Sequence, residues 1–256
     1  MERKKLIAGN WKMNTNHLEG IQMVQKLSYR LEREDYDRVD VLVCPPFTSL
    51  RSIQTVIGAD KMMIGLGAQN VDWRESGAYT GEISAEMLAK LDVSHVIVGH
   101  SERRQYFGET DETVNKRAKA VLAAEMTPII CIGETEEEYD NGRTMDVVLS
   151  QVSGGLAGLD SDIVGGLVMA YEPVWAIGTG KACSPERANE VCEAIRNRIS
   201  DEFGSAAAES VRIQYGGSVN PGNVKELMAK RHIDGALVGG ASLDPDKFAA
   251  VVRYWV

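Results

Sequence analysis

The sequence predicts an α/β protein, a closed (β/α)8 barrel in which a helix follows each of eight parallel strands. Short and nearly continuous apolar segments recur eight times: KLIAGN, VDVLVC, MIGLGAQ, HVIVGH, PIICIG, GLVMAY, RIQYGG and GALVGG. Strands buried on both faces have this composition. Polar segments with an apolar residue at every third or fourth position separate them, which is the periodicity of helices. Eight such units close naturally into a barrel.

The elements follow one another in the order strand, helix, strand. Strands are expected at residues 5–10, 39–44, 63–69, 95–100, 128–133, 166–171, 212–217 and 235–240. Helices are most clearly indicated at residues 20–34, 111–125, 184–203 and 220–230. The third of these helices opens with Ser184 as N-cap and Pro185 at the first helical position, and Asn220 with Pro221 repeats that start.

One domain over residues 1–256 is the preferred organisation, because a barrel of this type routinely uses about this length. No linker, repeat or low-complexity tract interrupts the pattern, although two smaller domains remain possible. An open doubly wound sheet is the alternative fold. It would need a G-x-G-x-x-G turn after the first strand, where the sequence has GNWKMN instead.

The charge balance limits the partners. A formal net charge of −9 disfavours nucleic acid and anionic lipid, which bind proteins largely through Lys and Arg. The amino terminus, MERKKLIAGNWK, has no signal-peptide core, and no stretch approaches the roughly 20 apolar residues that span a bilayer. We therefore expect a soluble, cytoplasmic protein without a nucleic-acid or membrane partner, which can still bind a small anion at a locally positive site.

Four cysteines are scattered along the chain: Cys44, Cys131, Cys183 and Cys192. There is no C-x-x-C pair and no His at ligand spacing, so neither a metal site nor a disulfide framework is indicated. Buried free thiols are expected.

Polar residues and glycines stand where the strands end. The carboxyl ends of barrel strands face one way and carry the chemistry. The residues expected there are Asn10, Lys12, His100, Glu172, Ser218, Gly239 and Gly240.

Glu172 follows the apolar strand GLVMAY, where a charge is costly unless it is paired, wet or functional. A structural ion pair is the simple alternative. The next residues, PVWAIGTGK, mix large apolar side chains with glycines and are expected to form a hinged flap that begins at Pro173. By excluding water, the flap would raise the pKa of Glu172 toward that of a useful base.

His100 precedes SERRQYF, which is expected to be the first turn of a helix with Ser101 near its cap. A structural histidine is the alternative. The positive end of the helix lowers the pKa of an imidazole, so His100 is expected to stay neutral and donate a hydrogen bond. Of the other histidines, His95 begins its strand at the far end of the barrel, and His17 and His232 lie in polar surroundings.

Lys12 would supply the positive charge that an acidic protein needs to hold an anion. Pairing with an acid such as Glu102 is the alternative role. The glycine pairs in YGGS and LVGGAS end neighbouring strands, where many barrels bind phosphate through backbone N–H groups. With Ser218 alongside they predict a phosphate site, and Gly178 of the flap could close over it. Each pair alone could be a tight turn.

Two further segments stand out. The acidic run in CIGETEEEYDNGR is interpreted as a solvated first helical turn without chemistry. GAQNVDWRESGAYTGE is a long loop after the third strand, and its small residues around Thr80 would suit insertion into a neighbouring subunit.

A base, a neutral donor, a lysine and a phosphate site under a flap suit proton abstraction next to the carbonyl of a small phosphorylated substrate. A Schiff-base aldolase would need a buried lysine where the sixth strand ends in Glu172. A flavin or nicotinamide enzyme would need more room. A binding protein that keeps the phosphate site, and an enzyme for a larger sugar phosphate, remain alternatives.

Seven motifs carry a resemblance to a known family. GNWKMN, GAYTGE, GHSERR, CIGET, AYEPVWAIGTGK, YGGSV and LVGGASL stand in the order and spacing of triosephosphate isomerases, over residues 5 to 254. The resemblance implies a TIM barrel and a cofactor-free interconversion of dihydroxyacetone phosphate and D-glyceraldehyde 3-phosphate, a step of glycolysis and gluconeogenesis.

The resemblance also implies roles for single residues. Glu172 would move the proton between carbons, His100 would polarise the carbonyl, and Lys12 and Asn10 would stabilise the enediolate. The phosphate would be held by Gly178, Ser218, Gly239 and Gly240. Supporting roles would fall to Ser101, Glu102, Ile177 and Leu237, the last two clamping apolar surface over the base.

The family is typically dimeric, with Thr80 reaching toward Asn10 and Lys12 of the partner, so the resemblance implies a homodimer. At the rear of the flap, Lys181-Ala182-Cys183 departs from the more usual Lys-Thr-Ala or Lys-Val-Ala. This departure bears on the motion of the lid and not on the reaction.

Overall fold

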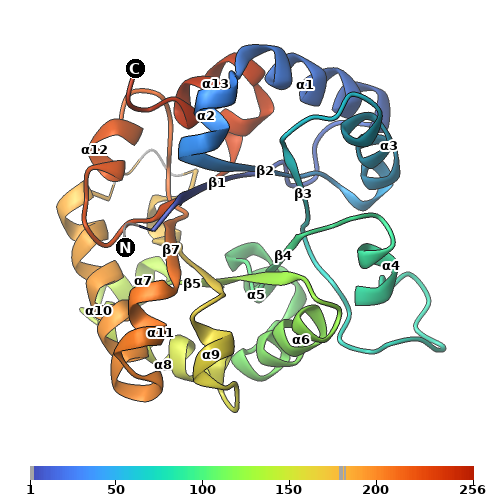
Figure 1. The fold of residues 1–256 in the computed structure, drawn as a ribbon. Helices are drawn as coiled ribbons and strands as arrows, with labels where there is room; N and C mark the ends of the chain where they lie inside the picture. The colour runs from blue at the N-terminus through green and yellow to red at the C-terminus, as the bar shows by residue number, and fades with distance from the viewer. Residues whose placement is uncertain (1–2, 179–180, 182) are drawn as a thin grey trace.

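The computed structural model describes residues 3–178, 181 and 183–256 of the chain. Eight parallel strands form a closed barrel in chain order, and β8 pairs with β1 to close it (Figure 1). The fold is a TIM barrel, as predicted. The strands are β1 (Lys5–Asn10), β2 (Val39–Cys44), β3 (Gly65–Ala68), β4 (His95–Val98), β5 (Thr127–Ile132), β6 (Val168–Tyr171), β7 (Arg212–Tyr215) and β8 (Gly235–Val238).

Helices surround the barrel on the outside (Figure 1). The α-helices are α1 (His17–Arg30), α2 (Arg33–Arg38), α3 (Phe47–Ala59), α4 (Ala85–Ala89), α5 (Ser101–Phe107), α6 (Asp111–Ala123), α7 (Glu136–Asp140), α8 (Thr144–Leu156), α9 (Ser161–Val164), α10 (Pro185–Phe203), α11 (Ser205–Ser210), α12 (Val224–Met228) and α13 (Pro245–Val252). Two 3-10 helices, η1 (Val174–Ala176) and η2 (Gly240–Leu243), lie among the loops after β6 and β8. No helix in the described part of the chain has the length and apolar character needed to cross a membrane.

The core has two layers, because alternate strand residues point to opposite faces. Side chains such as Leu42, Ile97 and Ile129 fill the inside of the barrel in one buried cluster. A larger cluster packs between the strands and the helices. Both faces of every strand are therefore covered, which explains the continuous apolar runs of the sequence.

Two predicted helix starts have different outcomes. Ser184 caps α10 as predicted, since its hydroxyl accepts the N–H of Arg187 at 3.2 Å. The start predicted at Asn220 is wrong, because α12 begins only at Val224. The side chain of Asn220 instead accepts the N–H of Gly222 at 2.8 Å and holds a tight turn.

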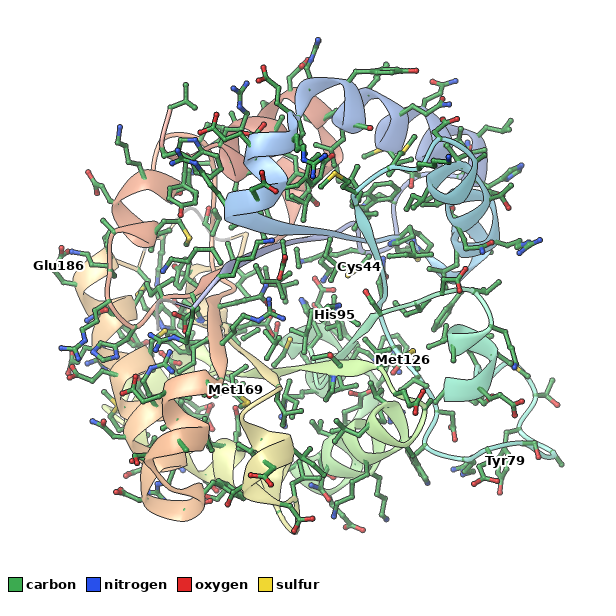
Figure 2. All side chains as sticks on the ribbon, in the orientation of Figure 1. Cys44, Tyr79, His95, Met126, Met169 and Glu186 are labelled. Atoms are coloured by element: carbon green, nitrogen blue, oxygen red, sulfur yellow. The ribbon has the colours of Figure 1, made fainter. Side chains whose placement is uncertain are left out.

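The four cysteines are free and buried, as predicted. Burial raises the pKa of the Cys44 thiol far above its ordinary value. The long loop after β3 projects away from the barrel, and Figure 2 shows Tyr79 near its tip. The side chain of Tyr79 is exposed and has the guanidinium of Arg74 over its ring, 3.8 Å from the ring centroid.

Candidate active site

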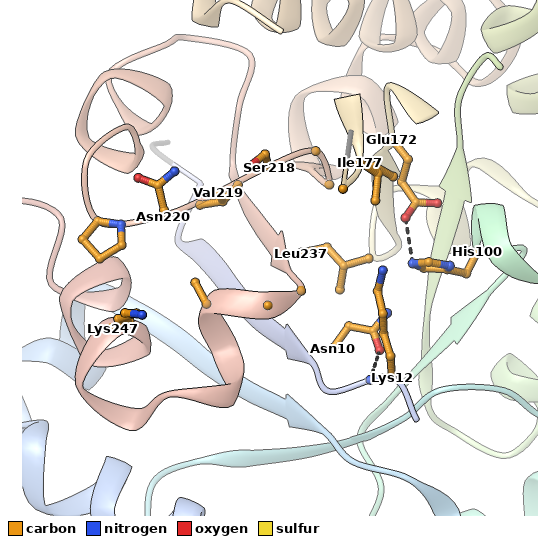
Figure 3. Close-up of a pocket in the computed structure, with 17 residues that line it drawn as sticks. Asn10, Lys12, His100, Glu172, Ile177, Ser218, Val219, Asn220, Leu237 and Lys247 are labelled. Atoms are coloured by element: carbon orange, nitrogen blue, oxygen red, sulfur yellow. Dashed lines mark hydrogen bonds and ion pairs between the residues drawn. The ribbon is translucent and has the colours of Figure 1, made fainter. Parts of the chain in front are cut away.

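One cavity of about 550 Å³ collects most of the strand-end residues that the sequence singled out (Figure 3). Its lining includes Asn10, Lys12, His100, Glu172, Ile177, Gly178, Ser218, Leu237, Gly239 and Gly240. Ser101 and Glu102 lie beside it, through contacts given below, whereas Thr80 is exposed on its loop and is not part of the lining.

Glu172 lies directly after β6 and is only 2% exposed. One carboxylate oxygen, Oε1, lies 2.9 Å from Nε2 of His100, and the other, Oε2, accepts the backbone N–H of Ser101 at 2.9 Å. Glycine is required nearby: a Cβ at Gly133 would lie 1.8 Å from the carbonyl oxygen of Glu172, and one at Gly216 would lie 2.9 Å from its Cγ. Backbone from two neighbouring strands therefore encloses the base.

The pKa of Glu172 is lower than that of an ordinary glutamate, not higher as the sequence interpretation expected. Burial raises the pKa. The contacts with His100, the N–H of Ser101 and the charge of Lys12 lower it, and together they outweigh the effect of burial. Glu172 is consequently a carboxylate that is ready to accept a proton. If the flap removed water from the site, the pKa of Glu172 would rise from this lowered value.

His100, and not Ser101, is the N-cap of α5, and its side chain makes the capping contact. Nδ1 accepts the backbone N–H of Glu102 at 3.2 Å. Because an acceptor nitrogen carries no proton, the proton of a neutral His100 is on Nε2. The cap thus fixes the tautomer that donates from Nε2 toward Glu172 and the cavity.

The pKa of His100 is raised in this arrangement, which corrects the expectation that the helix end lowers it. Burial lowers the pKa, but the adjacent Glu172 carboxylate outweighs burial, with a smaller contribution from Glu102. The contact that raises the pKa exists only while Glu172 touches the imidazole. A molecule inserted between the two side chains would remove it.

Lys12 is held in an uncommon backbone conformation, with φ of +52°. Its carbonyl accepts the amide of Gln69 at 2.9 Å, and its N–H donates to Oδ1 of Asn10 at 3.0 Å. Its ammonium pairs with Oε1 of Glu102 at 2.6 Å while also lining the cavity. The two roles considered for Lys12, ion pairing and a cation at the site, therefore occur together.

The expected phosphate side lies opposite the base. Gly239 precedes η2, and a Cβ built on Gly240 would meet nothing within 4 Å, so the backbone there is open toward the cavity. Ser218 lines the same wall from the loop after β7. Figure 3 shows Ser218 set apart from Glu172, with Ile177 and Leu237 between them.

The flap after Glu172 begins with η1, in which Trp175 is buried. The indole N–H of Trp175 donates to Glu134 at 2.8 Å, and the hydroxyl of Tyr171 donates to the same oxygen at 3.1 Å. Glu134 is fully buried and precedes the helical turn, beginning at Glu136, to which the solvated part of the acidic run was chiefly assigned. A carboxylate directly after a buried strand was the available signal.

Farther along the flap, Gly178 has φ of +70°, and Lys181 forms an ion pair with Glu136 of α7. Glu136 lies in the exposed first turn that the sequence predicted for the acidic run. Cys183 is buried. Ala182, the middle residue of the predicted rear hinge, lies outside the described residues.

One cavity of the barrel holds a buried carboxylate, an imidazole with a defined tautomer and a lysine, and they face open backbone. This arrangement defines a barrel enzyme for acid–base chemistry on a small anion. The comparisons with known proteins specify the family. Residues 5–255 match the family described as triosephosphate isomerase. The chain belongs to the triosephosphate isomerase family.

Individual relatives cover nearly the whole chain. A triosephosphate isomerase of Streptomyces coelicolor is 55% identical over 252 residues, which are 98% of each chain. One of Corynebacterium efficiens is 53% identical over 249 residues, 97% of this chain and 95% of that protein. The crystal structure of triosephosphate isomerase from Bartonella henselae superposes with a TM-score of 0.87 at 35% identity, covering 98% of this chain and 99% of that one.

Proposed function

We propose that this protein interconverts dihydroxyacetone phosphate and D-glyceraldehyde 3-phosphate by proton transfer through an enediolate, as a step of glycolysis and gluconeogenesis. The observation that supports it most directly is the 2.9 Å contact between the Glu172 carboxylate and Nε2 of His100, in a cavity that also holds Lys12. The side chains of the cavity can act as acids and bases, and we expect no cofactor.

Glu172 is assigned the carbon-to-carbon proton transfer. Its carboxylate takes a proton from the carbon next to the carbonyl, and the electron pair of that C–H bond forms the enediolate. The protonated Glu172 then returns the proton to the neighbouring carbon, so the reaction is balanced without an oxidant or reductant. Its lowered pKa keeps it ionised, and therefore competent, at neutral pH.

His100 is assigned the proton transfers at oxygen. Nε2–H is the donor left free by the helix cap, so it can polarise the carbonyl and pass protons between the two substrate oxygens. Lys12 and Asn10, which are hydrogen-bonded to each other, would orient the substrate and stabilise the negative enediolate. Lys12 also pairs with Glu102, so a bound substrate would share the ammonium with that carboxylate.

The far wall is assigned to the phosphate. Backbone N–H groups of Gly178, Gly239 and Gly240, with Ser218, would hold it, as in other barrels that bind phosphate after strands seven and eight. Ile177 and Leu237 line the cavity between that wall and the base. Closure of the flap would exclude water and suppress loss of phosphate from the enediolate.

The decisive experiment is a coupled assay of the purified protein with D-glyceraldehyde 3-phosphate. Turnover well above the uncatalysed rate is expected, with deuterium from solvent appearing in the product. Phosphate-ester binding without deuterium exchange would instead favour a non-catalytic binding protein. A larger sugar phosphate that turned over faster would favour a different isomerase.

We also propose that the protein works as a homodimer in the cytoplasm, without nucleic-acid or membrane partners. The exposed loop that carries Tyr79 and Thr80 projects from the barrel and offers a surface for a second copy. Exposed apolar side chains at Met13 and Phe107 would be covered by such a partner.

A further inference from the structure

The cavity continues beyond the wall assigned to the phosphate. Its lining also includes Val219, Asn220, Pro221, Ala241 and Lys247. Figure 3 shows Val219, Asn220 and Lys247 on the side away from His100 and Glu172. The cavity measures about 550 Å³, and this outer part of its lining lies beyond the wall assigned to the phosphate.

The polar groups of the outer part are hydrogen-bond donors. Asn220 uses Oδ1 to accept the N–H of Gly222, which leaves its Nδ2 group to donate to a ligand. Lys247 lies in the first turn of α13, and its side chain is 64% exposed. Its ammonium forms an ion pair with Oδ2 of Asp244 at 3.8 Å, and Oδ1 of the same carboxylate accepts two backbone N–H groups of α13.

The charges favour an anion in this outer part. Among the described residues that line the cavity, Glu172 is the one acidic side chain, and it lies at the opposite end. The cations of the described lining are Lys12, beside the base, and Lys247, in the outer part. A second anionic group bound there would meet Lys247 without facing a lining carboxylate.

We propose that Lys247 and Asn220 form a second anion subsite, which binds the far phosphate of a bisphosphorylated small molecule whose first phosphate occupies the wall of Ser218, Gly239 and Gly240. The inference rests on the phosphate site of the proposed function. A ligand that spans both subsites fills the cavity and excludes the substrate. The consequence is competitive inhibition by bisphosphates that is stronger than inhibition by monophosphates of the same length.

The test uses a series of α,ω-alkanediol bisphosphates, from three to six carbons, and the matching alkyl monophosphates. Titration calorimetry measures their affinities for the full-length protein, and competitive inhibition is measured in parallel. Bisphosphates of one preferred length are expected to bind more tightly than their monophosphates. Lys247→Gln is expected to weaken binding of that bisphosphate about twofold to fivefold, the range for one exposed ion pair, and to leave binding of the monophosphate unchanged.

Lys225→Gln is the matched control, because it removes the same charge from an exposed position of α12 that does not line this cavity. It should leave both affinities unchanged. The subsite is excluded if bisphosphates gain nothing over monophosphates, if Lys247→Gln weakens both classes equally, or if both variants have the same effect. Failure of the monophosphates themselves to bind would instead contradict the phosphate site of the proposed function.

Discussion

Nε2 of His100 lies 2.9 Å from Oε1 of Glu172, although the two residues follow β4 and β6, which are separated in the barrel by β5. The backbone holds both partners: His100 caps α5, and Glu172 accepts the N–H of Ser101, the first residue of that helix. The start of one helix therefore positions the acid and the base together. Each of the two side chains also changes the pKa of the other.

This coupling predicts the titration of His100. In the wild-type protein without ligand, the pKa of His100 is expected above its ordinary value of about 6.5, because the Glu172 carboxylate stabilises the imidazolium. In Glu172→Gln that charge is gone while burial remains, so the pKa should fall. The ¹⁵N shifts of the imidazole, followed by NMR over pH, measure both. An unchanged pKa in the variant would contradict the coupling.

The proposed role of Glu172 as the base predicts a specific loss of kcat. Glu172→Gln keeps the size of the side chain and removes the base, so kcat should fall by about 10²- to 10⁴-fold, the usual contribution of a general base. Affinity for an alkyl monophosphate should change little, because the phosphate wall is untouched. A coupled assay with calorimetry on the same samples separates the two effects, and full activity in the variant would end the assignment.

The barrel and its strand-end residues were predictable because both follow from short-range pattern. Buried strands produce continuous apolar runs, and the residue after each run necessarily lies at one end of the barrel. Glu172 and His100 could thus be selected from sequence position alone. Their pKa values could not, because these depend on a contact between two side chains that no local pattern encodes.

Burial within loops was only weakly indicated by the sequence. Glu134 stands in an acidic run and looks solvated, yet the fold surrounds it with Tyr171, Thr144 and Trp175. Asn220 and Pro221 match a helix start locally, but Asn220 closes a turn on Gly222 and the helix begins later. In both cases the local sequence is compatible with two structures, a solvated or a buried carboxylate and a helix start or a turn. Tertiary contacts determine which of the two forms.

Glu134 is predicted to anchor the start of the flap. Glu134→Ala would leave the buried donors of Tyr171 and Trp175 without their acceptor, so the free energy of unfolding should fall by about 2–4 kcal/mol. Loss of the anchor for Trp175 should also alter kcat. Denaturant unfolding and steady-state kinetics measure these effects. Glu137→Ala, at an exposed position of the same acidic run, should change stability by less than about 0.5 kcal/mol.

The proposed homodimer predicts that a substitution of Thr80 changes the oligomeric state. Sedimentation of the wild-type protein should give the mass of two chains. Thr80→Arg places a long charged side chain at the proposed contact and should shift the protein toward monomers, with reduced activity. Thr55→Arg, the same change at an exposed position of α3, should leave the mass unchanged. A wild-type monomer with full activity would rule out the proposed contact.

His95 predicts a pH dependence of stability that is independent of catalysis. Burial and the charge of Arg212 lower the pKa of His95 to about 4, and Asp40 only partly opposes this shift. The unfolded chain binds the same proton near pH 6.5, so between these values the unfolded state carries more protons and stability rises with pH. This effect of His95 is absent above about pH 6.5, and stability falls by about 3 kcal/mol as the pH decreases toward 4.

Substitution isolates this contribution. His95→Gln removes the titrating group, so the free energy of unfolding, measured by denaturant titration, should decline less steeply between pH 6.5 and 4 than in the wild-type protein. His17→Gln changes an exposed histidine and should follow the wild-type curve. If the three curves had the same slope, the acid sensitivity of the barrel would have to come from other groups. The site at the opposite end should keep its kcat at neutral pH in both variants, because His95 begins β4 whereas the catalytic residues follow the strand ends.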